Sequence, residues 1–246
     1  MINKIGKSFN RAKCDYQQHA VVQQQVWQRL IHLIDGRCNK KSINTLLELG
    51  CGNGKSSLLI AKKLQLQRYD AVDCANQLID QAIVECKDLG NLSFYCLDFD
   101  HELHKLSINY DMIIASMSLH WSNNINHLLS TLQQKLSTPG YLCISVPLQG
   151  TFAELSPYFR INLFSTDDGI RQLLYQNNFN ITEAITMHYI MSFSSKTEQL
   201  HHLRKTGVSC YIGNRDICIK STRQYLQQQS SPLQLSYAIG LYLAKI

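Results

Sequence analysis

The sequence predicts an α/β fold: a mostly parallel sheet with helices on both faces and an antiparallel pair of strands near the C-terminus. Two patterns predict it. Short apolar runs alternate with stretches of helical periodicity through the first 147 residues, which is typical of a parallel sheet covered by helices. Later, residues alternate from Glu183 onward, with apolar side chains at every second position over 185–193 and again over 235–243, which is strand spacing. With 45% hydrophobic and 17% charged residues in a chain of 246, there is enough apolar material for a buried core.

The helical and strand patterns follow one another in a regular order. An amphipathic helix is predicted over 16–35, because Val22, Val26 and Leu30 recur at helical spacing. Strands are then expected at 44–49, 69–73, 92–97, 111–116 and 141–146. Helices are expected between them at 55–64, 76–89 and 125–136, with a turn at 138–140.

The last third of the chain has a different pattern. Residues 150–165 are predicted to form a loop or lid, followed by a helix over 167–177. Two more helices, over 197–206 and 215–228, are expected between the late strands. Because the sequence shows no internal repeat and no linker rich in Pro, Gly or Ser, we expect a single domain over 1–246.

Composition argues against several classes of protein. No apolar run approaches the eighteen residues that span a membrane, and the N-terminus lacks the apolar stretch of a secretory signal, so we expect a cytoplasmic protein without a membrane partner. The nine cysteines are odd in number and include no Cys-x-x-Cys pair. Buried thiols are therefore expected in place of disulfides or a metal site.

The net charge of +6 is unevenly distributed. Residues 1–40 and 196–246 each carry +5, whereas 41–195 carry −4. No long Lys/Arg run or aromatic-basic strip is present, so nucleic acid is not an expected partner. The basic ends suit the rim of a site for an acidic partner.

A glycine loop is the most specific local signal. Glu48-Leu-Gly50-Cys-Gly52-Asn-Gly54 follows a predicted strand and precedes a predicted helix. Such a loop lets a ligand approach the backbone and the N–H groups of the helix N-terminus. A phosphate-binding P-loop would need Gly at Leu49, and a dinucleotide fingerprint would need Gly at Lys55. The acid-x-G-x-G-x-G form is the one that Rossmann-like methyltransferases dependent on S-adenosylmethionine (SAM) carry, and their sheet has seven strands.

Acids at the ends of the next two strands support this interpretation. Asp73 is placed to accept both ribose hydroxyls, and Asp98 to accept from the adenine amine while Phe99 flanks the ring. Any one acid at a strand end is as readily a helix cap, but three on successive strands favour SAM binding. The predicted cofactor site consists of Glu48, Gly50, Cys51, Gly52, Gly54, Asp73, Cys74, Asp98, Phe99 and Ser116.

Segments outside the loop resemble one family, the malonyl-acyl-carrier-protein O-methyltransferases of biotin biosynthesis. The similar segments span nearly the whole chain: Phe9–Ala12 with Tyr16–Gln23, Ser116–Trp121, Gln149–Leu155, 203–209 and 232–237. The sequence departs from the family pattern in having Glu48 for the usual Asp, His120 where Gln is frequent, and a short 150–165 lid.

The resemblance implies methyl transfer from SAM to the free carboxylate of a malonyl thioester, with S-adenosylhomocysteine as product. The implied partner is an acyl carrier protein bearing malonyl-phosphopantetheine, or malonyl-coenzyme A. Under this interpretation, 1–40 form an N-terminal helical lid, 41–147 the SAM-binding core, and 148–246 a lid and a substrate- or partner-facing part.

The implied reaction needs positioning more than proton transfer. A carboxylate is already ionised at neutral pH, so neither His19 nor His120 is nominated as a general base. The positioning candidates are Tyr16, His120 and Trp121, with core packing as the alternative for the last two. Candidates for holding the substrate carboxylate or the partner are Arg11, Arg160, Arg204 and Lys205.

Two rival functions remain open at this point. A carboxyl methyltransferase of the trans-aconitate type would share the cofactor site and act on a free small acid. A SAM-binding regulator would bind the cofactor without turnover.

Overall fold

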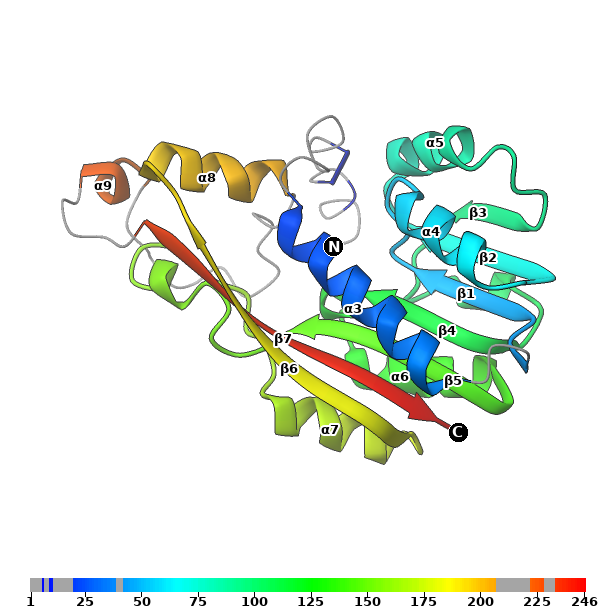
Figure 1. The fold of residues 1–246 in the computed structure, drawn as a ribbon. Helices are drawn as coiled ribbons and strands as arrows, with labels where there is room; N and C mark the ends of the chain where they lie inside the picture. The colour runs from blue at the N-terminus through cyan, green and yellow to red at the C-terminus, as the bar shows by residue number, and fades with distance from the viewer. Residues whose placement is uncertain (1–5, 7–8, 11–19, 39–41, 207–221, 228–232) are drawn as a thin grey trace.

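The computed structural model describes residues 6, 9–10, 20–38, 42–206, 222–227 and 233–246. Its centre is a seven-stranded sheet with the order β3-β2-β1-β4-β5-β7-β6 (Figure 1). The strands are β1 (Thr45–Leu49), β2 (Arg68–Asp73), β3 (Leu92–Cys96), β4 (Tyr110–Ser116), β5 (Leu136–Pro147), β6 (Asn180–Ser192) and β7 (Gln234–Lys245). The first five pair in parallel, whereas β7 runs antiparallel to both β5 and β6.

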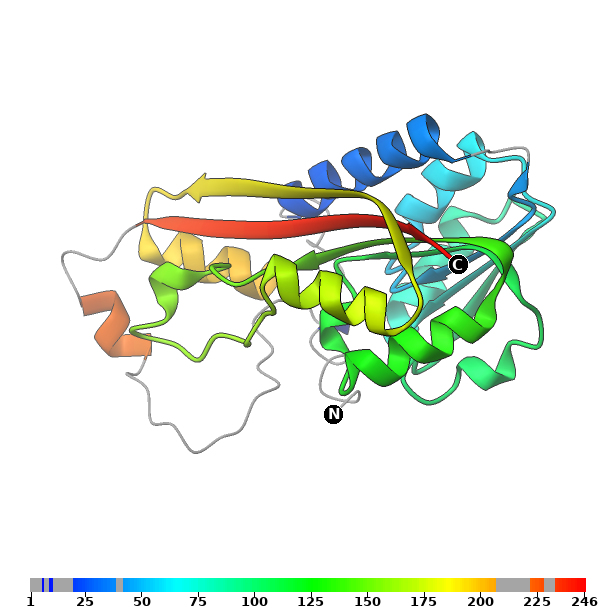
Figure 2. The same ribbon diagram turned by 90° about the horizontal axis from the view of Figure 1, so that it is seen from below.

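Helices cover both faces of this sheet, as Figure 2 shows edge-on. On one face lie α3 (Val21–Arg37), α4 (Lys55–Lys63) and α5 (Asn76–Glu85). On the other lie α6 (Ile125–Lys135) and α7 (Asp167–Gln176). Beyond the sheet, α8 (Lys196–Lys205) and α9 (Thr222–Gln227) lie near the far ends of β6 and β7. The short 3₁₀ helices are η2 (Leu103–Lys105), η3 (Leu119–Trp121) and η4 (Ala153–Leu155).

Alternation along the strands divides the core into two layers. In β1, Leu46 packs with Val26 of α3 on one face, while Leu47 packs with Leu128 of α6 on the other. All four of these side chains are at most 1% exposed. Because successive strand residues point to opposite faces, a strand buried on both sides is continuously apolar, which is the pattern that the sequence shows.

The expected fold class is confirmed, with differences at element boundaries. The prediction of a turn at 138–140 before the strand is wrong. Strand β5 already begins at Leu136 and contains the cis Thr138–Pro139 peptide. A register shift opposite Tyr110 and Met112 accommodates this irregular start. Helix α5 ends at Glu85, earlier than predicted, and the first four residues of the predicted 16–35 helix lie outside the described part of the chain.

No helix among the described residues is long and apolar enough to cross a bilayer. The cysteines that the structure describes carry free thiols. Three of them, Cys51, Cys86 and Cys143, are buried, whereas Cys96 is exposed, contrary to the expectation of buried thiols.

Close packing around Gly240 fixes α7 against the C-terminal strand pair. The Tyr242 ring lies across the position that a Cβ on Gly240 would occupy, 2.4 Å from the phenol oxygen. From there, the fully buried Tyr242 donates a hydrogen bond of 2.6 Å to Asp167 Oδ1, in the first turn of α7. A glycine at 240 is thus what lets this ring lie flat along β7.

We therefore expect Gly240→Ala to lower the free energy of unfolding by about 1–3 kcal/mol, because the added methyl must displace a pinned ring. Urea denaturation measures the change. Gly36→Ala is the matched control, since a Cβ there meets nothing within 4 Å and the residue lies in α3, so its stability should be unchanged or raised. Equal stability of the two variants would contradict the account of Tyr242.

Candidate cofactor and substrate site

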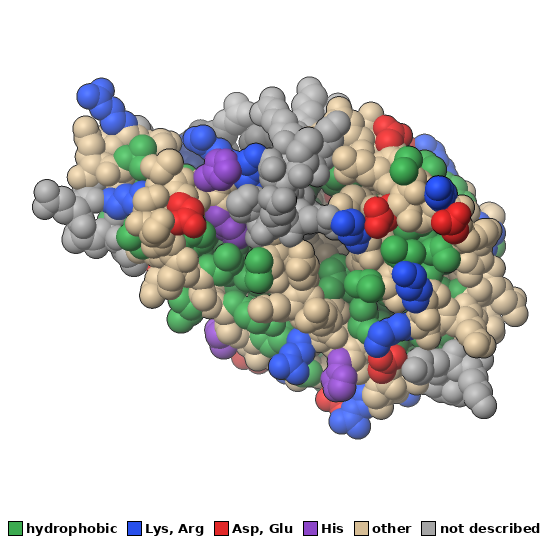
Figure 3. Space-filling view, turned by 45° about the horizontal axis from the view of Figure 1, so that its top comes forward, with side chains coloured by type: hydrophobic (Ala, Val, Ile, Leu, Met, Phe, Trp, Pro, Cys, Tyr) green, Lys and Arg blue, Asp and Glu red, His purple; other side chains and the backbone are tan. Residues whose placement is uncertain are grey.

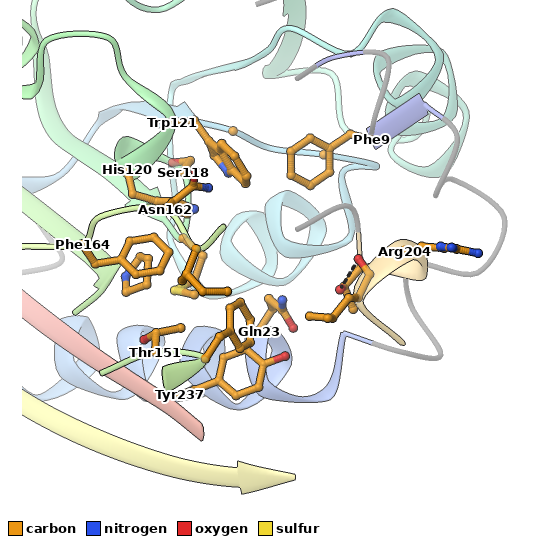
Figure 4. A pocket seen from close by; sticks show the side chains of 18 of the residues that line it. Phe9, Gln23, Ser118, His120, Trp121, Thr151, Asn162, Phe164, Arg204 and Tyr237 are labelled. Carbon is orange, nitrogen blue, oxygen red and sulfur yellow. Dashed lines mark hydrogen bonds between the residues drawn. The ribbon is translucent and has the colours of Figure 1, made fainter. Parts of the chain in front are cut away.

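A cavity of about 340 Å³ lies at the carboxyl ends of the parallel strands (Figure 4). Its wall includes the glycine loop after β1, Asp73 at the end of β2, Phe99 after β3 and Ser116 at the end of β4. A smaller cavity of about 110 Å³ adjoins it and shares Gly50 and Ser116. This edge is where an open α/β sheet binds its ligands, and the size suits a small-molecule site.

The glycine loop has the backbone shape that its composition requires. Gly50, Gly52 and Gly54 have φ angles of 78°, 56° and 79°, in the left-handed region that favours glycine. A Cβ on Gly50 would stand 2.5 Å from the Cβ of Ser118, whose hydroxyl donates to the Leu49 carbonyl at 2.7 Å. The loop thus packs closely on the segment after β4. Gly50 and Gly52 line the cavity, and Cys51 lines the smaller one.

Glu48 lies beneath this loop, not against the cavity. Its side chain is completely buried and accepts hydrogen bonds from Ser56 (2.9 Å), Ser57 and Tyr69 (2.6 Å). Burial raises the pKa of the carboxyl, and the three hydroxyl donors oppose that rise. Glu48 therefore joins β1 to the start of α4 and to β2. Direct contact with a cofactor, as predicted from the motif, is not available to a side chain with no exposed surface.

Asp73 lines the cavity and also shapes it. One carboxylate oxygen accepts from the Gly52 N–H at 2.9 Å and the other from the Ala75 N–H at 2.8 Å. Burial raises the pKa of this carboxyl, and the backbone donors oppose the rise. The Asp73 side chain thus closes the glycine loop onto the end of β2 and faces the place predicted for a ribose.

The residues after β3 are divided between the cavity and their own loop. Phe99 lines the cavity, as does Cys74 after β2. Asp98 instead accepts from the Asp100 N–H at 2.8 Å through Oδ1, so part of its carboxylate is used locally. Burial raises its pKa. Its contact with an adenine amine stays a prediction.

His120 and Trp121 meet in the cavity wall on η3. Their ring centroids are 4.7 Å apart, and Phe164 lies 5.8 Å from His120 on the other side. Phe9 approaches Trp121 edge-on at 5.7 Å. Burial alone lowers the pKa of His120 to about 3, so the imidazole is neutral at physiological pH. Both residues therefore combine packing with a place in the site.

The predicted cations are placed unequally. Arg11 and Tyr16 lie outside the described residues. Arg160 and Arg204 line the cavity, and in Figure 4 the Arg204 side chain lies apart from the other labelled residues and points away from them. Lys205 is half-buried in the last turn of α8 and is not among the lining residues.

Other lining residues were not singled out as site residues by the sequence, although Gln23, Met117 and Tyr237 lie in segments that resemble the family. Gln23 of α3 is 7% exposed and lines both cavities, and its buried Oε1 has no hydrogen-bond partner among the described residues. It ends the family-like segment 16–23, but it is one of three consecutive glutamines, and the pattern does not distinguish which of them reaches the site. Phe164 and Tyr237 reach the site from segments far along the chain. Met117 was detectable only in the structure, where it adopts a strained φ of 52° at the cavity wall.

Comparisons with known proteins agree with this geometry. A family model described as a methyltransferase domain matches residues 19–184. Malonyl-acyl-carrier-protein O-methyltransferase 2 of Coxiella burnetii is 28% identical, covering 98% of this chain and 95% of its own length. The malonyl-acyl-carrier-protein O-methyltransferase of Bacillus cereus is 32% identical, covering 85% of this chain and 82% of its own. The chain belongs to the methyltransferase family that this model and these relatives represent.

Solved structures show the same methyltransferase fold. The N-methyltransferase NodS of Bradyrhizobium japonicum, in complex with S-adenosylhomocysteine, aligns with a TM-score of 0.56 at 12% identity, over 90% of this chain and 86% of that one. The YcgJ protein of Bacillus subtilis aligns with a TM-score of 0.62 at 12% identity, over 89% and 98%. These likenesses concern the fold. Membership of the methyltransferase family is what makes the chain a SAM-dependent O-methyltransferase, with SAM as the methyl donor.

The residues present fit this cofactor. The positive-φ glycines leave the backbone open to a ligand, and Asp73 supplies a carboxylate for sugar hydroxyls. The Oε1 of Gln23, which has no hydrogen-bond partner among the described residues, is a buried acceptor of the kind that a bound ligand satisfies. When bound, SAM supplies a methyl group as the electrophile.

The low pKa of the His120 imidazole leads to a specific prediction of how stability depends on pH. Its pKa is depressed on folding, from about 6.5 to about 3, so its contribution to stability is present above pH 6.5 and is lost as the pH falls towards 3. At about 1.4 kcal/mol per pH unit, the wild type should lose about 2 kcal/mol more than His120→Gln between pH 6.5 and 5.

Urea denaturation at several pH values measures this difference. The charged groups that line the same cavity, Asp73, Arg160 and Arg204, are common to both proteins and cancel in the comparison. Parallel curves for wild type and His120→Gln would show that His120 protonates freely in the folded protein.

Proposed function

We propose that this enzyme methylates the free carboxylate of a malonyl group carried by an acyl carrier protein, the reaction named for its relatives in Coxiella burnetii and Bacillus cereus. The observation that carries the proposal is that one cavity joins the cofactor loop to an apolar chamber whose histidine is kept neutral. A carboxylate substrate needs such a chamber and no base, whereas a hydroxyl or amine substrate needs help in losing a proton.

For this reaction the protein must align the substrate carboxylate with the methyl group and exclude water from the site. A carboxylate oxygen forms the new O–CH₃ bond while the C–S bond breaks and its electron pair stays on sulfur, so no proton moves. Phe152, Phe159, Phe164 and Trp121 line the chamber and keep water from the carboxylate, whose hydration would blunt its nucleophilicity. Holding the two reactants in line accounts for a large share of such rate enhancements.

Strand order supports an orientation for the cofactor. The sheet places β3, β2, β1 and β4 side by side, so Phe99, Asp73, Gly50 and Ser116 form a row along its carboxyl edge. We assign the adenine to Phe99, the ribose to Asp73 and the amino-acid end to the Gly50–Ser116 end of the row, beside Gln23. A primary amide can accept from an ammonium and donate to a carboxylate, which suits Gln23 to that end.

The region around α8 supports the assignment of an acidic carrier as partner. The last turn of this helix carries Arg204 and Lys205, and Arg160 and Arg204 line the same cavity, whereas His202 of that turn is buried against Tyr237. Figure 3 shows Lys, Arg and His side chains gathered around the α8 end of the molecule. A carrier protein docked there would thread its phosphopantetheine arm into the chamber, and the association would weaken with salt. In this proposal, 41–147 bind the cofactor, and 1–40 with 148–246 enclose the substrate in a cytoplasmic enzyme.

Intact-mass analysis tests the reaction. With SAM and this enzyme, malonyl-carrier protein should gain one methyl group, whereas acetyl-carrier protein, which lacks the free carboxyl, should not change. Malonyl-coenzyme A in a third reaction reports whether the carrier is required. Methylation of free tricarboxylic acids alone would indicate the trans-aconitate type, and SAM binding without transfer to any acid would indicate a regulator.

A pair of substitutions tests the cofactor orientation by binding alone. Asp73→Asn should weaken both S-adenosylhomocysteine and methylthioadenosine about tenfold or more, because both contain the ribose and lose a charge-assisted hydrogen bond. Gln23→Leu should weaken only S-adenosylhomocysteine, because methylthioadenosine lacks the amino-acid end. Isothermal titration calorimetry gives the four dissociation constants. If Gln23→Leu weakened the binding of both ligands equally, the assignment of the amino-acid end of the cofactor to Gln23 would be wrong.

A further inference from the structure

His120 presents its two ring nitrogens to different surroundings. Nδ1 is buried and has no hydrogen-bond partner among the described residues. The residue as a whole is only partly buried, and its remaining nitrogen, Nε2, is the one open to the cavity that His120 lines. The ring is held between Trp121 and Phe164, so its orientation is set by aromatic packing.

This asymmetry decides where the single proton of the neutral ring lies. A buried N–H without an acceptor is rarer and more costly than a buried acceptor without a donor. Nδ1 therefore keeps its lone pair, and the proton is on Nε2. The cavity thus receives one neutral N–H donor, pointing into the apolar chamber described above.

The charge change of the proposed reaction favours a donor of this kind. As the methyl group is transferred, the carboxylate loses its negative charge. A fixed cation beside it would stabilise the reactant more than the transition state and so raise the barrier. A neutral N–H gives a hydrogen bond that fixes direction while losing less as the charge disappears.

From this geometry we infer that His120 donates its Nε2–H to one oxygen of the substrate carboxylate, and so orients the other oxygen for methyl transfer without pairing its charge. The inference rests on the proposed function. It assigns Arg160 and Arg204 to the carrier and its phosphopantetheine arm, away from the reacting carboxylate.

The tautomer can be tested without turnover. ¹⁵N NMR of the enzyme labelled at histidine distinguishes a protonated from an unprotonated ring nitrogen, and His120→Gln identifies the signals. The expected spectrum has the proton on Nε2 of His120 and does not change between pH 8 and 5.5. Asp73, Arg160, Arg204 and the phenol of Tyr237 line the same cavity, but burial alone sets the pKa of His120, so no neighbour should introduce a titration. A proton on Nδ1 would overturn the inference.

Kinetics with malonyl-carrier protein test the role. His120→Leu should lower kcat/KM roughly ten- to hundredfold while leaving the dissociation constant for S-adenosylhomocysteine unchanged, which also shows that the variant is folded. His120→Gln, whose amide N–H can replace the donor, should recover most of that loss. His120→Arg should lower KM and kcat together, because a cation binds the reactant more tightly than the transition state.

The matched control is His127→Leu, the same substitution at an exposed site on α6, which should keep the wild-type constants. A fully active His120→Leu, or a His120→Arg with raised kcat, would overturn the inference while leaving the proposed function intact. A wild type that transfers no methyl group to malonyl-carrier protein would remove the proposed function, and this inference with it.

Discussion

The buried carboxyl of Glu48 is the interaction on which the arrangement of the site depends. It gathers hydroxyl donors from Ser56, Ser57 and Tyr69, and so joins β1, the first turn of α4 and β2 directly below the glycine loop. Above it, Asp73 binds the loop from the next strand end. The Glu48 carboxyl is thus completely enclosed and structural, while the Asp73 carboxyl is open to the cavity, although the sequence predicted both as cofactor-binding acids at strand ends. Their different burial gives them these different tasks.

The part of the fold that rests on periodicity was predictable. Apolar runs fixed the order of strands and helices, and alternation over 183–193 and 235–243 identified the antiparallel pair. Boundaries were less certain where local chemistry competes: Pro139 indicated a turn, but pairing with β4 and β7 keeps that segment in a strand. In the site, glycines and strand-end acids gave strong signals because their spacing is constrained. Gln23 and Phe164 were not identified as site residues, because only the tertiary fold brings α3 and the 147–164 segment to the cavity.

The cavity is polar at one end and apolar at the other, and the two ends have different roles in the proposed reaction. Backbone N–H groups and Asp73 face the cofactor end, where a polar ligand must be held. Aromatic side chains from η3, the 152–164 segment and the N-terminal Phe9 surround the other end. Low polarity there strengthens each remaining hydrogen bond, so a single neutral donor can direct a reactant. In the proposed function, the basic residues near α8 meet the carrier protein, and screening by water and salt limits them to attracting and placing it.

The position of β7 also affects how the protein is made. Of the seven strands of this sheet, β7 is synthesised last, yet it lies between β5 and β6. Until its residues leave the ribosome, the long strand β6 has no neighbour to pair with, and the exposed edge of β5 is open to other chains. The parallel half of the sheet can form earlier, from segments close together in sequence. A nascent chain therefore passes through a stage with an assembled cofactor edge and two unpaired strand edges, during which binding by a chaperone is most useful.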